Sequence, residues 1–432
     1  MSQSRKNFVL LLLAVVVLAA VYVLYVLLRP VGPDPVAPVS GAPEQFTDQV
    51  ARGRYLARAA DCVACHTAKG GKPYAGGGEF ELPFGKLYAT NITPDVETGI
   101  GAWTDEQFVR AVREGAGSQG NLYPAMPYTS YAGMSRDDVL AIKAYLFSLA
   151  PVRQANKPLE LAFPFNQRWG MTFWKLGFFD NRRFAPDPQK SEQWNRGAYL
   201  ANTLGHCGEC HTPRNLAFAM DTSQHFSGEV VDGWLASNIT PQAESGIGAW
   251  SDEQLAAYLS TGHAPGRSSA SGPMAEVIQH SLQFLVPEDI QALVAYLRDI
   301  PALPGDKAVR VNLTPAGAQA ANAMLPAAQQ SSLGQRLFAQ SCAGCHTWNG
   351  EGRQSPYAGL KGSTASNDPK GRNIVKAILD GTHIVVGGRE EAMPAFGESH
   401  TDIEVAAIAN YVLAQFGDKQ GPVTPEQVAA QR

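Results

Sequence analysis

The stretch DCVACH, residues 61–66, places two cysteines three positions apart and a histidine directly after the second. The same pattern returns as CGECH at residues 207–211 and as CAGCH at residues 342–346. Together the three motifs contain all 6 cysteines of the 432-residue chain. Since no thiol is left over for another purpose, one chemistry has to account for all of them.

Three common uses of paired cysteines fit this pattern poorly. A redox dithiol is typical of a thioredoxin-like strand and helix, and it does not need a histidine after each pair. Structural zinc requires a second pair of ligands close to each motif, and every other cysteine belongs to another motif. A disulfide within such a tight loop is usually catalytic rather than structural.

Covalently bound haem explains both the spacing and the histidine. The two thiols of the motif add to the haem vinyl groups, and the adjacent histidine becomes the proximal ligand of the iron. The sequence therefore predicts three covalently bound haem c groups. Their predicted anchors are Cys62, Cys65, Cys207, Cys210, Cys342 and Cys345, and their predicted iron ligands are His66, His211 and His346. His206, directly before Cys207, has no counterpart in the other motifs and is expected at the surface.

Methionine is the usual second axial ligand in electron-carrying c-type cytochromes. We predict this role for Met126 in YPAMPY, Met274 in SGPMAEV and Met393 in AMPAFG. Each is expected in a loop that carries proline or glycine ahead of the last helix of its unit. Three histidines are the competing candidates: His263, His280 and His383. The competition is closest at Met274, because His280 is near it in the sequence.

An internal repeat indicates how the chain is divided. Residues 91–107 and 238–254 are identical at 13 of 17 positions, in the runs NITPDVETGIGAWTDEQ and NITPQAESGIGAWSDEQ. We interpret this as a duplication that produced cytochrome c domain 1, residues 46–150, and domain 2, residues 191–302. A third domain, residues 331–418, has its own motif but lacks the NITP run.

Helical patterns begin and end each of these units. A short helix is expected before each motif, at residues 49–60, 192–203 and 333–341. A longer helix is expected at the end of each unit, at residues 135–149, 286–300 and 401–417, because each stretch has acids in its first turn and then apolar residues at helical spacing. The predicted fold class is all-α, with three cytochrome c-like helical domains after an N-terminal transmembrane helix.

Residues 151–190, 303–330 and 419–432 are predicted to be two linkers and a tail. The first linker is rich in aromatic residues. They pack between domains 1 and 2, or they form a docking face for a partner subunit, a quinone or a membrane surface. The second linker is rich in Ala, Pro and Gln, as in a plain connector.

The N-terminus carries an apolar run of 21 residues, Phe8 to Leu28, after Arg5 and Lys6. At about 1.5 Å per residue this run reaches about 31 Å as a helix, which is enough to cross a bilayer. The basic pair keeps the N-terminus in the cytoplasm and exports the rest. Residues 1–29 are therefore predicted as a membrane anchor, with a signal peptide cut after Ala20 as the alternative. The proline-rich residues 30–45 are expected to form an extended tether.

The overall charge argues against one class of partner. The net charge is −4 and the sequence pI is about 6.2, with 17% charged residues. Binding to nucleic acid requires a clear basic excess, so no nucleic-acid partner is expected.

The motifs together resemble one family: the three-haem cytochrome c subunits of bacterial membrane-bound periplasmic dehydrogenases for alcohol, gluconate, fructose or aldehyde. The resemblance runs from residue 46 to residue 417 and rests on the three CxxCH motifs, the paired NIT…GIGAW runs, YPAMPY, GPMAEV and MPAF. It implies the nine cysteine and histidine haem contacts given above and Met126, Met274 and Met393 as distal ligands.

The resemblance also implies partners and a location. Family members take electrons from a catalytic dehydrogenase subunit, which is a quinoprotein, a flavoprotein or a molybdenum enzyme, and pass them to ubiquinone or a terminal oxidase. The implied location is the inner membrane with the globular domains in the periplasm. Many members have a cleavable signal, whereas this chain carries the long apolar run described above, so its mode of attachment is a departure.

Two functions from different classes follow. The first is an electron-transfer subunit with no substrate site of its own. The second is a multihaem c-type enzyme, such as a peroxidase or a thiosulfate dehydrogenase, in which one haem iron is open or has another ligand. A subunit of a haem–copper oxidase is a weaker third idea. Three candidate methionines for three haems favour the first function.

Overall fold

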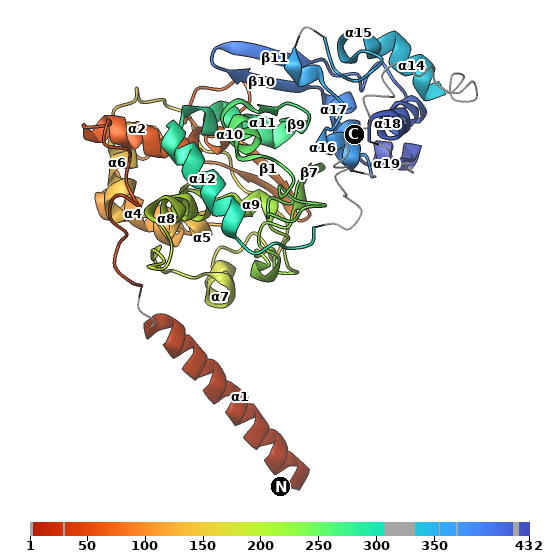
Figure 1. The fold of residues 1–432 in the computed structure, drawn as a ribbon. Helices are drawn as coiled ribbons and strands as arrows, with labels where there is room; N and C mark the ends of the chain where they lie inside the picture. Colours follow the sequence, from red (N-terminus) through yellow and green to blue (C-terminus); the bar gives the residue numbers. More distant parts are fainter. Residues whose placement is uncertain (1–2, 29–30, 306–332, 354, 369, 418–422) are drawn as a thin grey trace.

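The computed structural model describes residues 3–28, 31–305, 333–353, 355–368, 370–417 and 423–432 (Figure 1). Most of the second linker and the start of the tail, residues 306–332 and 418–422, lie outside the described residues. Helix α1 (Gln3–Leu28) projects from a globular body, with the N-terminus at its far end. The residues from 333 onward gather at one side of that body, in blue in Figure 1.

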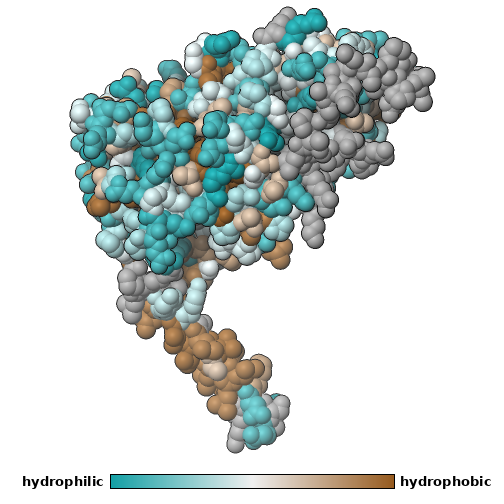
Figure 2. Space-filling view, viewed as in Figure 1, coloured by the Kyte–Doolittle hydropathy of each residue, from teal (hydrophilic) through white to brown (hydrophobic). Residues whose placement is uncertain are grey.

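Helix α1 has the length and composition of a membrane-spanning helix. Its most apolar window, Asn7–Tyr25, has a mean hydropathy of 3.0, and none of it is buried against the rest of the protein. Figure 2 shows it as an apolar column below a mostly hydrophilic body. The helix is continuous through Ala20, where the alternative signal cleavage would fall.

Three helix pairs form the framework of the body, and they occupy the predicted positions. In each pair the helix before a CxxCH motif packs against the last helix of the same unit. The pairs are α2 (Gln49–Ala59) with α6 (Arg136–Phe147), α8 (Glu192–Tyr199) with α12 (Pro287–Asp299), and α14 (Leu333–Ser341) with α18 (Asp402–Phe416). Ser135 and Thr401 cap α6 and α18, since each side chain accepts a hydrogen bond from a backbone N–H of the first turn.

A glycine makes each of these helix crossings possible. A Cβ atom on Gly53 would stand 1.8 Å from the carbonyl oxygen of Ala141, far inside van der Waals contact. The same relationship recurs at 1.9 Å between Gly197 and Ala292, and at 2.1 Å between Gly334 and Ala407. Because no side chain fits at these positions, the two backbones approach more closely than any other residue would allow.

The second unit contains one residue more than the first between the tyrosine of its opening helix and its first cysteine. Tyr55 precedes Cys62 by seven positions, whereas Tyr199 precedes Cys207 by eight. A π-helical turn, η1 (Leu200–Leu204), takes up the extra residue. The turn therefore keeps the second motif in the same relation to its helix as the first.

His206 does not lie free at the surface as expected from the sequence. Its φ of 38° matches the φ of 48° at Asp61, the residue that precedes the first motif, so the two positions are structural equivalents. The His206 ring packs edge-on against Tyr131, with 5.5 Å between ring centroids. The prediction was wrong because the partner ring comes from residues far away in the sequence.

The fold is largely helical, as predicted from the sequence, and it also contains short strands. Short antiparallel hairpins join the helices, and one three-stranded sheet has the order β1-β2-β5. The strands are β1 (Glu79–Leu82), β2 (Gly85–Tyr88), β3 (Ala116–Gly117), β4 (Gly120–Asn121), β5 (Glu160–Leu161), β6 (Glu229–Val231), β7 (Trp234–Ala236), β8 (His263–Ala264), β9 (Ser268–Ser269), β10 (Thr382–Val386) and β11 (Arg389–Met393). They are too short to show an alternating pattern in the sequence.

Several further helices complete the body. They are α4 (Asp105–Glu114), α5 (Tyr128–Tyr131), α7 (Gly170–Phe178), α10 (Asp252–Thr261), α11 (Gly272–His280), α16 (Thr364–Asn367), α17 (Arg372–Asp380) and α19 (Pro425–Ala429), with 3-10 turns η2 (Thr222–Gln224), η3 (Leu282–Phe284) and η5 (Pro356–Ala358). Helices α4 and α10 occupy equivalent places after the two GIGAW runs, and each begins with a full capping box.

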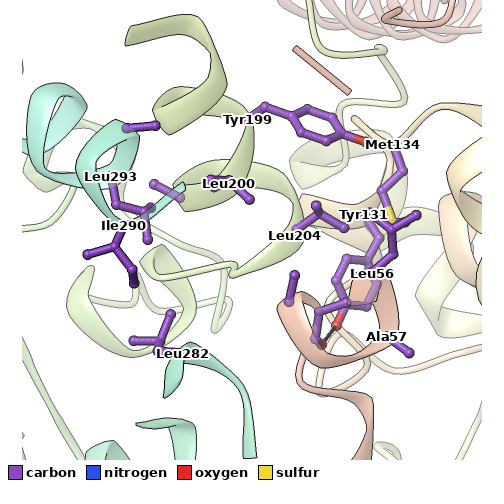
Figure 3. Close-up of a cluster of buried hydrophobic side chains, with 14 of the residues drawn as sticks. Leu56, Ala57, Tyr131, Met134, Tyr199, Leu200, Leu204, Leu282, Ile290 and Leu293 are labelled. Carbon is purple, nitrogen blue, oxygen red and sulfur yellow. Dashed lines mark hydrogen bonds between the residues drawn. The ribbon is translucent and has the colours of Figure 1, made fainter. Parts of the chain in front are cut away.

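The first two units share one continuous hydrophobic core. Figure 3 shows part of it, where Met134 and Leu56 of the first unit lie toward Tyr199 and Leu204 of the second. Residues of the third unit form a core of their own around Phe338 and Leu413. The body is therefore built from one large double unit and one smaller unit.

Polar contacts join the third unit to the double unit. The side chain of Gln279 in α11 accepts from the N–H of Val385 in β10 at 2.8 Å. Gln283 donates to the carbonyl of Val385 at 2.9 Å and accepts from the N–H of Gly387 at 3.0 Å. The two glutamine side chains thus provide hydrogen-bond partners for backbone N–H and C=O groups at one edge of the β10–β11 hairpin.

The proline-rich segment after α1 is bound along the body. The carboxylate of Asp34 accepts hydrogen bonds from both Nη atoms of Arg113, at 2.8 and 3.2 Å, and from the N–H of Arg136 at 2.7 Å. Val39 is buried, and its carbonyl accepts from Arg196 at 2.9 Å. The segment was expected to be extended, but it turns at residues 36–40, where the N–H of Ser40 donates to the carbonyl of Val36 at 3.1 Å, and it is seated on the protein.

Candidate haem-binding sites

Each CxxCH motif forms one turn of helix that presents its two thiols on one side. The turns are α3 (Cys62–Cys65), α9 (Gly208–His211) and α15 (Ala343–His346). In each turn, the N–H of the histidine donates to the carbonyl of the first cysteine, at 3.1 Å in the first motif and 3.0 Å in the other two. Cysteines three residues apart lie on the same face of a helix, so both sulfurs of a motif face the same side.

The motif histidines are oriented in one common way. His66 donates from Nδ1 to the carbonyl of Thr90 at 2.7 Å, His211 to Ser237 at 2.6 Å, and His346 to Ala358 at 2.7 Å. A carbonyl can only accept, so Nδ1 carries the proton in every case. The lone pair is then on Nε2, the nitrogen that is free to bind iron.

The repeated NIT run places two of these carbonyls. Thr90 and Ser237 each come directly before the asparagine of NIT. The side chain of Asn91 accepts from the N–H of Thr93 at 2.9 Å and donates to the carbonyl of Val152 at 2.7 Å. Asn238 makes the equivalent bonds to Thr240 at 2.8 Å and Leu303 at 2.9 Å. The sequence showed the NIT repeat, but it did not show that the repeat fixes the carbonyls to which His66 and His211 donate.

Burial keeps the three motif histidines neutral and the thiols of Cys62 and Cys207 protonated. Desolvation lowers the pKa of His66, His211 and His346 below the ordinary imidazole value, and the bond to a carbonyl opposes it. Burial raises the pKa of the Cys62 and Cys207 thiols to about 12. A catalytic dithiol has the opposite shift, because it needs a thiolate near neutral pH.

The residues present fit haem c better than the other chemistries. All 6 cysteines are free thiols, so none is used in a disulfide. Across the described ranges, no three side chains of His, Cys, Asp or Glu come together to form a cage for a metal ion. What each motif does supply is a pair of free thiols and one neutral imidazole with its Nε2 lone pair available, which is the donor set for a thioether-linked haem.

The three candidate methionines lie in different local structures. Met126 is in a turn before α5 and is partly buried against the shared core, as a loop position would be. Met274 lies in the first turn of α11, not in a loop, because Pro273 starts a helix there. Met393 is the last residue of β11 and packs against the core of the third unit, so it too is outside a loop.

The competing histidines have other surroundings. His280 is the last residue of α11, six positions beyond Met274, which corresponds to about 9 Å along the helix and a different face. His263 contacts Ser269 through Nδ1 at 3.0 Å, and the exposed His383 contacts Glu390 through Nε2 at 3.0 Å. Met220 lies beside the second motif itself, since its sulfur would be 3.2 Å from a Cβ on Gly208.

A helical fold with CxxCH turns, each histidine fixed by a carbonyl, defines a c-type cytochrome, and such domains bind haem c covalently. Two family models agree. "Cytochrome c" matches residues 50–150, and "Cytochrome C oxidase, cbb3-type, subunit III" matches residues 329–412. The second motif lies between the two matched ranges.

Relatives with assigned roles narrow the family further. The chain is 39% identical to a fructose dehydrogenase cytochrome subunit of Gluconobacter japonicus, over 88% of this chain and 82% of the relative. It is 38% identical to a gluconate 2-dehydrogenase cytochrome c subunit of Pantoea cypripedii, over 90% and 91%. It is 35% identical to an alcohol dehydrogenase (quinone) cytochrome c subunit of Gluconobacter oxydans, over 85% and 79%. The chain belongs to this family of dehydrogenase cytochrome c subunits.

Proposed function

We propose that this chain is a three-haem electron-transfer subunit. In this proposal the six motif cysteines hold three haem c groups, His66, His211 and His346 are the proximal ligands, and the chain has no substrate site of its own. Haem supplies a one-electron redox centre at each site when it is bound. The protein supplies the anchoring sulfurs, the fixed imidazoles and the burial that excludes water.

The observation that carries the proposal is the threefold recurrence of one arrangement. In each unit a CxxCH turn, a histidine Nδ1–carbonyl bond and a glycine helix crossing occur together. The second unit is the one that neither family model covers, and it has all three features. This supports three haems and three cytochrome c domains. The equivalent NIT networks in the first two units support their origin by duplication.

We assign the distal positions to Met126, Met274 and Met393. Each side chain is partly buried against the core of its own unit, which is what a ligand held in a haem pocket requires. For Met274 the helix geometry adds support, since α11 directs His280 away from it. Histidine with methionine is the ligand pair of electron carriers, and it leaves no iron position for a substrate.

The family relationship supports a catalytic dehydrogenase as the electron donor. The relatives are named as cytochrome subunits of fructose dehydrogenase, gluconate 2-dehydrogenase and alcohol dehydrogenase (quinone). The donor that we propose is a quinoprotein, a flavoprotein or a molybdenum enzyme. We propose that electrons leave to ubiquinone or a terminal oxidase. The proposed location is the inner membrane with the globular body in the periplasm, and it is supported by the apolar span of α1 and by the two basic residues in its first turns.

Isolation of the native complex tests this proposal. The chain should be tagged at its C-terminus, extracted from membranes in mild detergent, and purified with whatever accompanies it. We expect a large catalytic subunit to co-purify, and we expect the substrate of that subunit to reduce the haems of the complex but not those of the isolated chain. Direct oxidation of a substrate by the isolated chain would contradict the proposal and favour a multihaem enzyme.

A further inference from the structure

The aromatic linker is divided between packed and exposed side chains. Trp174 points inward, and its indole N–H donates to the carbonyl of Ala217 at 2.8 Å. In contrast, Phe163 is 79%, Trp169 66% and Phe173 67% exposed, in and just before α7. Large aromatic rings exposed together are unusual on a soluble surface and indicate a surface that something else covers.

This exposed aromatic surface lies beside the membrane helix. The hydroxyl of Tyr22 in α1 donates to the carbonyl of Leu176 in α7 at 2.8 Å. Figure 1 shows α7 on the side of the body from which α1 projects. The apolar span of α1 is Asn7–Tyr25, so Tyr22 is three residues, about 4.5 Å, before the outer end of that span. In a bilayer crossed by this span, α7 would therefore lie near the outer boundary of the hydrocarbon layer.

The seated proline-rich segment holds the body at that level. Only residues 29 and 30 separate α1 from Val31, whose carbonyl accepts from the N–H of Arg183 at 2.9 Å. Arg183 also lies 3.5 Å from the Asp34 carboxylate. Three Cα steps from Leu28 to Val31 reach at most about 11 Å. The body therefore cannot swing far from the end of α1, and α7 stays beside it.

We propose that α7 and the aromatic residues just before it form a second membrane contact, seated in the headgroup layer of the outer leaflet next to α1. Aromatic rings are enriched at this depth, where a layer of about 5 to 7 Å separates hydrocarbon from water. A soluble partner at the same place would have to displace lipid from around α1. This inference rests on the proposed membrane anchor, and it deepens that proposal by fixing how the body faces the membrane.

Two exposed tryptophans of the same chain provide the test. The full-length haem-loaded chain is placed in nanodiscs of phosphatidylethanolamine and phosphatidylglycerol, with one copy in each nanodisc. It is then oxidised with hydroxyl radicals, and mass spectrometry maps which side chains are modified. Trp348 in the third unit is 54% exposed against 66% for Trp169, so a free body predicts similar oxidation of both. We expect Trp169 to be oxidised at least about fivefold more slowly than Trp348, because lipid headgroups cover it.

Oxidation of Tyr22 and Tyr25 in the same experiment distinguishes a failure of the proposed membrane anchor from a failure of the proposed second contact. If both tyrosines are protected while Trp169 is oxidised as fast as Trp348, the anchor stands and the second contact is wrong. If the tyrosines are oxidised freely as well, the anchor itself fails. The Phe173→Asp variant places a charge in the contact, and it should restore oxidation of Trp169 without changing the haem content. Protection of Trp169 that survives this substitution would contradict the proposal.

Discussion

Tyr55 and Asp289 are joined by a buried hydrogen bond of 2.5 Å although 234 residues separate them in the sequence. Tyr199 of the second unit corresponds to Tyr55, and Asp138 of the first unit corresponds to Asp289. These two residues form the same bond from the second unit to the first, since the Tyr199 hydroxyl donates to the Asp138 carboxylate, also at 2.5 Å. Arg196 adds a bidentate pair to Asp289 at 2.8 and 2.7 Å. The first two units are thus joined by a reciprocal pair of polar contacts within a shared core.

The Tyr55→Phe variant tests this junction. The substitution removes one buried donor to a carboxylate, so we expect a loss of about 1 to 3 kcal/mol in the free energy of unfolding. Tyr88→Phe is the matched control, because the hydroxyl of Tyr88 bonds to Glu160 on the exposed surface at 3.1 Å. Chemical denaturation measures both variants. Equal losses in the two would show that the junction contributes nothing beyond a surface contact.

Asp138 should give this junction a pH dependence. Burial raises its pKa above the ordinary carboxyl value, and the hydrogen bonds from Tyr199 and Gly41 oppose the shift. A carboxyl group with a raised folded pKa contributes stability below its unfolded pKa, about 4, and this contribution is lost as the pH rises through the folded value. The stability of the wild type relative to Asp138→Asn should therefore fall as the pH rises above about 4.

Asp95 provides the opposite control. The hydrogen bonds from Thr98 lower the pKa of Asp95, so its contribution should be lost only as the pH falls below about 4. Unfolding free energies of Asp95→Asn, Asp138→Asn and the wild type are measured across this pH range. The difference from the wild type should change with pH in opposite directions for the two variants. The same slope for both variants would contradict the assignment at Asp138.

The helix crossings predict a severe effect for a very small substitution. Gly53→Ala, Gly197→Ala and Gly334→Ala each force a methyl group onto a carbonyl of the facing helix, and we expect each to cost about 1 to 3 kcal/mol or more. Gly177→Ala in α7 is the control, because a Cβ there meets nothing within 4 Å. This control should be neutral or slightly stabilising. Thermal unfolding of the four variants makes the comparison, and tolerance of alanine at the crossings would rule out this packing.

The number of haems can be counted directly. We expect the pyridine haemochrome assay to give three haems per chain, all retained after acid–acetone extraction. The double variant Cys342→Ala and Cys345→Ala should give two, and the same double change at Cys207 and Cys210 should also give two. A wild-type ratio of two, unchanged by one of these double substitutions, would show that the corresponding motif binds no haem.

The sequence predicted the parts of this protein that depend on local patterns. The helices that open and close each unit follow from caps and apolar spacing, and the helix of Met274 could also have been predicted, since Gly272 and Pro273 are a recognisable start signal. The role of NIT was not visible, because the carbonyl that orients His66 belongs to a residue 24 positions away. The Tyr55–Asp289 bond and the contact of the His206 ring with Tyr131 depend in the same way on contacts between distant segments.

The central claim is that every haem iron in this chain is held by two protein ligands, so that the chain carries electrons and transforms no substrate. A carbon monoxide difference spectrum of the reduced, undenatured chain tests it most directly. The Met274→Ala variant is the positive control, because it opens one iron, and Met220→Ala is the matched control in the same unit. We predict that the wild type and Met220→Ala bind almost no carbon monoxide, whereas Met274→Ala binds about one per chain. Stoichiometric binding by one haem of the wild type would contradict the claim and favour a multihaem enzyme.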